Sequence, residues 1–389
     1  MHFGKYATTF RLRTLGTQAG RKRETELEGL RVLIAGGGTG GHIIPALAVA
    51  RELKKRHSAE VLFVGTARGL ETRLVPEAGF ALRLIQVGQL NKVSLATRAR
   101  TVLGLPKNLF DCRALIREFR PGAVFGVGGY ASGPAMAAAL WMRVPTMAFE
   151  PNAMPGMANR LVGKRVQAAA VNFPDAAKWF RNCEGTGIPV RPEFFAIRDA
   201  DPGAPPRLLV FGGSQGARIL NTTLPPLAKW LLAKVPGLTI LHQSGPRGLE
   251  STQAAYAASG ADRDRWQVRA YLDDMPAQFA QASLVVARSG ASTVAELAAA
   301  GKPSLLVPFA AAADAHQKRN AEAMVAAGAA VMIEEKDLGD GTSIREAIAA
   351  LHGTPGRLQA MGAAARLQAH PDAAERIADR LAELAKGRG

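Results

Sequence analysis

The sequence predicts an α/β protein built from two doubly wound parallel sheets, and three observations lead to this fold class. Short apolar runs with the length of buried strands alternate with helical stretches through both halves of the chain. The order of strand, glycine turn and helix that begins at residue 31 recurs from residue 207. A chain of 389 residues also has the length of two domains of ordinary size.

Each half of the chain contains a series of predicted strands joined by helical stretches. In the first half they are 31–35, 60–64, 82–87, 123–127, 145–149 and 167–172. In the second half they are 208–211, 238–242, 267–270, 283–287, 304–307 and 330–333. We therefore expect two Rossmann-like domains facing each other across a cleft, with a glycine loop on each wall of a small-molecule site.

Residue composition distinguishes an N-terminal extension, two domains and a linker. Residues 1–29 are basic, lack the apolar core of a secretory signal, and are expected to be a poorly ordered extension. The two domains are assigned to 30–192 and 193–367. The polar, proline-rich stretch 198–206 suits a linker. It contains the D-x-D pair Asp199 and Asp201, but a connector is a poor place for a metal that holds a nucleotide sugar.

Charge and residue usage narrow the class of partner. A net charge of +17 and a pI near 10.4 indicate a polyanionic partner, such as phosphorylated substrates, an anionic membrane face or nucleic acid. Aromatic residues make up only 6% and are not interleaved with basic runs, which argues against nucleic acid. Cys112 and Cys183 form no disulfide framework or metal motif and fit a reducing cytoplasm. The uncharged stretch 121–142 contains too many glycines and prolines for a membrane span.

The glycine-rich turn 36–41 follows the first strand and precedes a helix expected from Ile43, with Pro45 in its first turn. A helix start favours phosphate, and His42 adds a titratable group. The G-x-G-x-x-G pattern does not indicate NAD, because no acidic residue ends the second strand, 61–64. A tight turn without a ligand is the alternative.

The stretch 283–308 carries the second motif, in which a strand leads to a helix predicted over 294–300. Ser292 or Thr293 is expected to cap this helix and to leave backbone amides for phosphate. Glu296 would repel a phosphate, so we expect it to accept hydrogen bonds from a ribose diol. The alternative is that this carboxylate only favours the helix dipole.

The basic amphipathic region 92–119 has two interpretations. It forms two ordinary surface helices, or it attaches the protein to an anionic membrane face. Pro106 argues against one unbroken helix.

These motifs closely resemble the MurG family of UDP-N-acetylglucosamine transferases, which convert lipid I to lipid II in peptidoglycan biosynthesis. The resemblance covers nearly all of 31–380. Its segments are GGGTGGHIIPALAVA (36–50), GVGGYASGP (126–134), EPNAMPGMANR (150–160), GIPVR (187–191), FGGSQGARILN (211–221), HQSG (242–245), YLDDM (271–275), RSGASTVAELAAAGKP (288–303) and HQKRNA (316–321). It implies glycosyltransferase family 28, a GT-B fold, and a C-terminal helix at about 368–387 that crosses back to the first domain.

The resemblance also implies the residues that bind the donor UDP-GlcNAc. On the second domain they would be Ser214 at the phosphates, Tyr271 and the Leu272 backbone at the uracil, Ala291, Ser292, Thr293, Val294, Ala295 and Glu296 at diphosphate and ribose, and Gln317 at the sugar. Arg191 would contact the nucleotide, and Thr39, Gly40, Gly41 and Asn152 would close on the sugar from the first domain.

The acceptor implied by the resemblance is an undecaprenyl-diphosphate MurNAc-pentapeptide, with its diphosphate at Gly37, Gly38 and Tyr130. The sugar is transferred with inversion; His42 is the candidate base, and Glu150 is a second candidate. No metal-ligand motif occurs, so no cofactor is expected to be required, although a divalent cation could stimulate the reaction.

The resemblance also implies a location and partners. The protein would lie peripherally on the anionic cytoplasmic face of the bacterial plasma membrane. Its further partners would be other cell-wall or division proteins, and nucleic acid would not be among them.

Two positions depart from the family pattern. Pro151 replaces the usual glutamine of Glu-Gln-Asn, and an alanine run at 310–313 replaces a proline and histidine after Phe309, which puts donor contacts from that loop in question. Two other functions remain open from the sequence. They are another GT-B nucleotide-sugar transferase that acts on a glycolipid, and a non-enzymatic basic Rossmann protein that binds a nucleotide or RNA.

Overall fold

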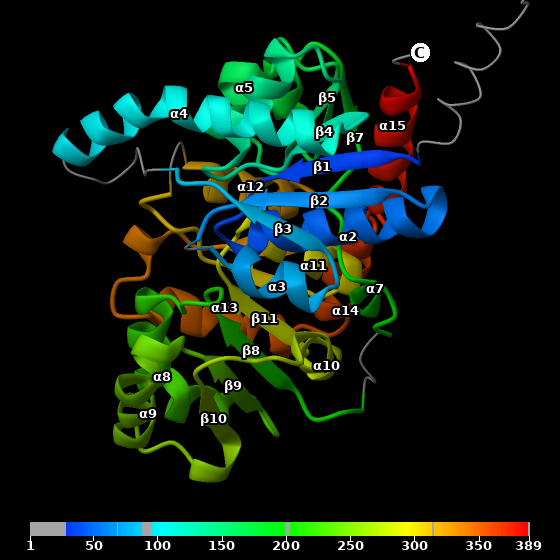
Figure 1. Ribbon diagram of the computed structural model, residues 1–389. Coiled ribbons are helices and arrows are strands. Elements are labelled where there is room, and N and C mark those ends of the chain that lie inside the picture. Colours follow the sequence, from blue (N-terminus) through cyan, green and yellow to red (C-terminus); the bar gives the residue numbers. More distant parts are fainter. Residues whose placement is uncertain (1–28, 68, 88–94, 199–202, 313–314, 388–389) are drawn as a thin grey trace, which may run out of the picture.

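The computed structural model describes residues 29–67, 69–87, 95–198, 203–312 and 315–387, and it shows two α/β units, one above the other in Figure 1. The extension 1–28 and the D-x-D pair lie outside the described residues. Each unit is a parallel sheet with helices on both faces. The predicted fold class is therefore confirmed.

The first sheet has the strand order β3-β2-β1-β4-β5-β6-β7. Its strands are β1 (Arg31–Ala35), β2 (Glu60–Gly65), β3 (Ala81–Leu84), β4 (Ala123–Gly126), β5 (Thr146–Glu150), β6 (Ala168–Val171) and β7 (Cys183–Gly185). Its helices are α2 (Gly40–His57), α3 (Glu71–Glu77), α4 (Leu95–Phe119), α5 (Ser132–Trp141) and α6 (Met157–Val162). Side chains alternate along β1, so that Val32 and Ile34 belong to the core under α2, and Leu33 to the core under α4 and α5.

The second sheet has the strand order β10-β9-β8-β11-β12-β13. Its strands are β8 (Arg207–Phe211), β9 (Thr239–Gln243), β10 (Trp266–Arg269), β11 (Leu284–Ala287), β12 (Ser304–Leu306) and β13 (Ala330–Met332). The helices of this half are α7 (Pro192–Phe195), α8 (Arg218–Lys234), α9 (Leu249–Ala258), α10 (Met275–Gln281), α11 (Ala291–Ala300), α12 (His316–Ala326), α13 (Thr342–Gly353), α14 (Arg357–Arg366) and α15 (Ala373–Lys386). Every strand predicted from the sequence is present, and β7 was not predicted because it is short, exposed and at the sheet edge.

The predicted break at Pro106 is wrong, because α4 continues through this residue for 25 residues and projects from the body of the protein (Figure 1). A proline removes one backbone hydrogen bond, while the turns on either side keep theirs. The turns after Pro106 also bury Cys112, Leu115 and Ile116 against the first sheet. This packing stabilises a single helix through the proline.

The C-terminal helix α15 returns to the first domain and lies beside α2 (Figure 1). Ile377, Ala378 and Leu381 enter the core under α2. At the helix surface Arg56 pairs with Asp379 at 2.7 Å. Within the described residues, no helix combines the length and apolar character needed to cross a bilayer.

Candidate active site

The carboxyl ends of the two parallel sheets face each other, and their loops meet at one point. A methyl group placed on Gly41, in the first turn of α2, would lie 3.4 Å from Oγ of Ser292, in the first turn of α11. Ala291 and Ala295 of the same α11 turns contact the core of the first domain. The two predicted motifs therefore form one site between the domains.

His42 is oriented by the glycine loop. Helix α2 begins at Gly40, three residues earlier than expected, so that His42 lies in the first turn and Pro45 lies further inside the helix. Nδ1 of His42 is 3.1 Å from the carbonyl oxygen of Gly37 and 3.4 Å from the hydroxyl of Thr39. A carbonyl only accepts, so Nδ1 carries the proton and donates it, and Nε2 keeps a free lone pair.

The pKa of His42 is lowered, and the cause is chiefly burial rather than the helix dipole. The bond to the Gly37 carbonyl and the charge of Glu71 oppose this shift. Nε2 faces the turn 127–130 after β4, called here the second glycine loop, where a methyl on Gly128 would lie 3.0 Å from it. The result is a neutral imidazole whose basic nitrogen is Nε2.

Glu150 is held in a different way, and its geometry argues against a role as base. The residue is 2% exposed, and both carboxylate oxygens accept hydrogen bonds. The donors are Asn152, through backbone N–H and side chain, the backbone of Gly156, and Asn159, at 2.9–3.1 Å. Burial raises the pKa of Glu150 and these bonds oppose the rise. Glu150 therefore anchors the loop 151–156 and sets the position of Asn152.

The first glycine loop offers fewer phosphate donors than the motif predicts. The N–H of Gly38 donates to Oε2 of Glu71 at 2.7 Å, and Gly37 is buried. A phosphate at Gly38 would compete with this bond and face a carboxylate, which argues against Gly38 as the site of the acceptor diphosphate. Tyr130 remains exposed beside the second glycine loop. In the described structure, the N–H groups of Thr39, Gly40 and Gly41 make no hydrogen bond to the rest of the chain.

Helix α11 begins at Ala291 and its N-cap is Gly290, so the prediction that Ser292 or Thr293 caps it is wrong. Gly290 occupies the extended cap position, which leaves both hydroxyls inside the first turn. The Oγ of Ser292 is buried without a hydrogen-bond partner in the described structure. This free hydroxyl and the uncapped first turn form a polar surface suited to a phosphate.

Glu296 lies on the next turn of α11, directly after Ala295, which packs against the core of the first domain. Burial raises the pKa of Glu296 to about 7, and the positive charge of Arg191 opposes this rise. The Nε of Arg191 is also buried without a hydrogen-bond partner among the described residues, and its guanidinium lies 5.0 Å from the Phe194 ring centroid. The structure thus brings Glu296 and Arg191 together, as expected.

The loops at the expected uracil position are joined by Gln243, which the sequence analysis missed. Its buried side chain donates to the carbonyl of Gly213 at 3.0 Å and accepts from the N–H of Leu272 at 2.9 Å. The Leu272 N–H is therefore occupied, and only its carbonyl is left to read a base. Tyr271 and Ser214 are exposed on either side.

Gln317 connects the site to the loop that carries the alanine run. Its side-chain oxygen accepts from the N–H of Phe309 at 3.0 Å, and its backbone carbonyl accepts from Ser289 at 2.8 Å. The amide NH₂ of Gln317 remains available as a donor for a sugar hydroxyl. The alanine run is described only as far as residue 312.

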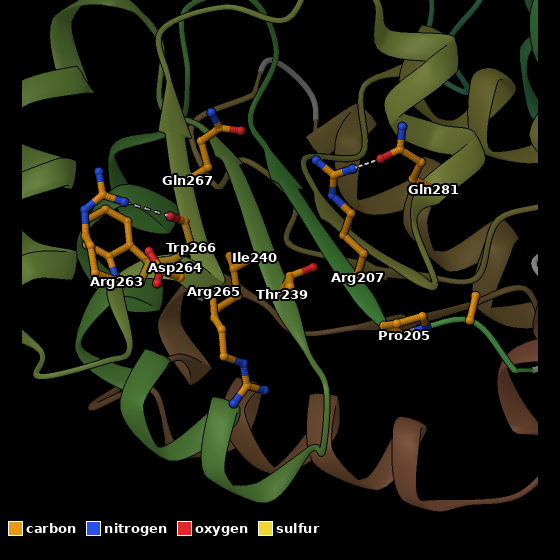
Figure 2. Close-up of a pocket in the computed structure, with 11 residues that line it drawn as sticks. Pro205, Arg207, Thr239, Ile240, Arg263, Asp264, Arg265, Trp266, Gln267 and Gln281 are labelled. Atoms are coloured by element: carbon orange, nitrogen blue, oxygen red, sulfur yellow. Dashed lines mark hydrogen bonds between the residues drawn. The ribbon is translucent and has the colours of Figure 1, made fainter.

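A cavity of about 670 Å³ lies at the amino ends of β8, β9 and β10, on the edge of the sheet opposite the site (Figure 2). The guanidinium groups of Arg207, Arg263 and Arg265 point in different directions in this view. They contact Gln281, Trp266 and the carbonyl of Leu238 respectively. The cavity therefore offers no convergent set of donors for an anion.

No group of three or more His, Cys, Asp or Glu side chains that could hold a metal ion occurs within the described part of the chain. The positive groups at the domain junction are Arg191 and the first turn of α11.

The chain is similar in sequence to known glycosyltransferases. Residues 32–171 match the N-terminal domain of glycosyltransferase family 28, and residues 207–377 match its C-terminal domain. The UDP-N-acetylglucosamine–N-acetylmuramyl-(pentapeptide) pyrophosphoryl-undecaprenol N-acetylglucosamine transferase of Solibacter usitatus is 46% identical over 358 residues, covering 91% of this chain and 96% of the relative. The chain belongs to the MurG family, within glycosyltransferase family 28.

Other members of the MurG family are also similar to the chain over most of its length. The transferase of the same name from Stutzerimonas stutzeri is 43% identical, covering 92% of this chain and 99% of its own. The crystal structure of MurG from Acinetobacter baumannii superposes with a TM-score of 0.74 at 30% identity, over 91% of this chain and 99% of that one. The GT-B fold implied by the resemblance is confirmed.

Proposed function

We propose that this MurG-family chain transfers N-acetylglucosamine from UDP-GlcNAc to the 4-hydroxyl of MurNAc in lipid I, which yields lipid II. The observation that carries this proposal is near-full-length identity to transferases named for that reaction. The junction between Gly41 and Ser292 supports it, because the buried Oγ of Ser292 has no hydrogen-bond partner there among the described residues.

In the proposed mechanism, the first domain removes the proton of the acceptor hydroxyl, and the second domain binds the donor and stabilises the leaving UDP. Nε2 of His42 accepts the proton of the attacking MurNAc hydroxyl, and the new glycosidic bond forms at the anomeric carbon as UDP leaves. Arg191 and the first turn of α11 stabilise the charge that develops on the diphosphate, so that no bound metal is needed. Glu296 accepts hydrogen bonds from the ribose hydroxyls, and the amide of Gln317 donates to the sugar. The acceptor diphosphate lies at the free N–H groups of 39–41.

We further propose that the chain binds peripherally to the anionic cytoplasmic face of the plasma membrane through α4 and α5. Phe110 and Trp141, on these two helices, are 56% and 52% exposed and pack edge to face. The guanidinium of Arg113 lies 4.4 Å from the Trp141 ring centroid. Lys107 is exposed one turn before Phe110. Aromatic and basic side chains on one surface suit an anionic lipid interface.

The reaction is tested by incubating the purified protein with UDP-GlcNAc and a lipid I analogue. We expect UDP and the disaccharide-linked lipid as products, also in the presence of EDTA. Transfer to other glycolipids but not to the lipid I analogue would favour the alternative GT-B enzyme. Salt-dependent RNA binding, without any stabilisation by UDP-GlcNAc, would favour the RNA-binding alternative.

Replacing Glu296 by Gln should weaken UDP-GlcNAc binding by roughly 10- to 100-fold, because the ribose loses a charged acceptor. The wild-type affinity should fall by about tenfold from pH 8 to pH 6, as a carboxylate with a pKa of about 7 takes up a proton. E296Q should bind with no such pH dependence. Calorimetric titration measures both effects, and the exposed Glu193→Gln is the control. An unchanged E296Q affinity would remove Glu296 from the donor site.

Replacing His42 by Ala should lower kcat by about 10²–10⁴-fold and leave UDP affinity nearly unchanged. The acid limb of the pH–rate profile, which should lie below pH 6.5 because burial lowers the pKa of His42, should disappear. His42→Asn retains a donor for the Gly37 carbonyl but lacks a nitrogen at the Nε2 position. A role as base predicts that both variants lose kcat equally. An Asn variant with nearly wild-type kcat would show that His42 only holds the loop.

Replacing both Phe110 and Trp141 by Ala should lower binding to anionic liposomes by at least about tenfold, because two large side chains no longer enter the interface. Binding of the wild type should fall as salt rises and as anionic lipid is removed. Trp230→Ala is the matched control, since Trp230 is an exposed tryptophan 4.6 Å from Arg345 on the second domain. Equal binding to neutral and anionic liposomes would contradict the proposal.

A further inference from the structure

Glu71 is a fully buried carboxylate at the start of α3, directly behind the first glycine loop. Its Oε1 accepts from the backbone N–H of Thr66 at 2.8 Å and from its hydroxyl at 3.0 Å, and its Oε2 accepts from the N–H of Gly38 at 2.7 Å. A methyl group on Gly37, Gly65 or Gly69 would collide with this side chain. The glycines around it thus leave room for the buried carboxylate.

The bond to Gly38 reaches His42 through a single peptide group. The N–H of Gly38 and the carbonyl of Gly37 belong to the same planar unit. That carbonyl accepts the Nδ1 proton of His42 at 3.1 Å. The Glu71 carboxylate therefore accepts a hydrogen bond from the N–H of this peptide group, and the imidazole of His42 donates a hydrogen bond to its carbonyl.

We propose that Glu71 is a positioning residue for the transfer reaction: its carboxylate fixes the Gly37–Gly38 peptide group, and the carbonyl of that group fixes the Nδ1–H tautomer of His42. This inference rests on the proposed function, since it assigns Nε2 of His42 the role of base. The carboxylate orients the imidazole through a backbone amide instead of touching it.

A peptide group between two glycines needs such a support. Gly38 has a φ of 91°, and glycine has no Cβ to restrict rotation of the neighbouring peptide planes. If the peptide unit turned over, its N–H would face the ring and Nδ1 would have to accept. The proton would then move to Nε2, and the lone pair that receives the acceptor proton would be lost. A hydrogen bond to a carboxylate also polarises the amide and strengthens its carbonyl as an acceptor.

The electrostatic surroundings agree with this arrangement. Within the described structure, burial lowers the pKa of His42, and the charge of Glu71 acts in the opposite direction. The other groups that contact the ring, at Gly37, Thr39 and Gly128, are uncharged. Loss of the Glu71 charge should therefore move the acid limb of kcat to lower pH, because this charge favours the protonated ring.

The first test is Glu71→Gln in the full chain, which keeps the volume but turns an NH₂ group toward the N–H of Gly38 or Thr66. We expect kcat to fall about 10- to 100-fold while KM for UDP-GlcNAc changes less than about twofold, because the donor is held by the other domain. Nitrogen-15 spectra of the histidine-labelled protein, with His42→Asn to assign the signal, should show a loss of the Nδ1–H form. Glu77→Gln, an exposed carboxylate on the same helix, is the control and should change neither measurement.

A second variant covers the case in which E71Q does not fold. Gly69→Ala places a methyl where the Glu71 carboxylate lies and should displace it without removing its charge. We expect the same loss of kcat and of the Nδ1–H form in G69A. Wild-type kcat and tautomer in either folded variant, or the Nε2–H form in the wild type, would overturn the proposal. The tautomer is read without substrate, so absence of transfer by the wild type would contradict the proposed function and leave this test intact.

Discussion

The approach of two helix N-termini across the domain junction is the constraint on which the site depends. Both sheets are parallel, so their loops gather at the carboxyl edges, and the junction joins those edges. The two helix starts approach so closely that a methyl group on Gly41 would be in van der Waals contact with Oγ of Ser292, at 3.4 Å. Because the two domains meet through their motifs, a ligand bound at one helix start lies within reach of the other.

The fold could be predicted from the sequence because its signals are local. Buried parallel strands are short apolar runs, and glycine turns mark their ends, so every predicted strand was found. Features set by tertiary packing could not be predicted in this way. Helix α4 continues through Pro106 because one face of its second half is buried, and α11 begins at Ala291 although Ser292 and Thr293 are the better capping residues.

The candidate site was predicted as a set of residues, but their roles depend on hydrogen bonds that motifs do not contain. Glu150, Gly38 and Leu272 all lie where the motifs place them. Each has a partner elsewhere in the chain that occupies the relevant atom: Asn159, Glu71 and Gln243. Buried polar groups need partners, and for Gly38 and Leu272 these partners come from segments about 30 residues away in the sequence. The contacts of Glu71 and Gln243 with the loops of the candidate site became apparent only in the structure.

The distribution of charge separates the two halves of the reaction. The first glycine loop has a carboxylate, Glu71, behind it, which favours a basic imidazole and opposes an anion at Gly38. The opposite wall has Arg191 and the uncapped turn of α11, which favour a leaving diphosphate. In the proposed reaction, a proton is accepted on one side of the junction and negative charge develops on the other. The two walls of the junction thus differ in the charge that acts on the site, with a carboxylate behind His42 and an arginine beside Glu296.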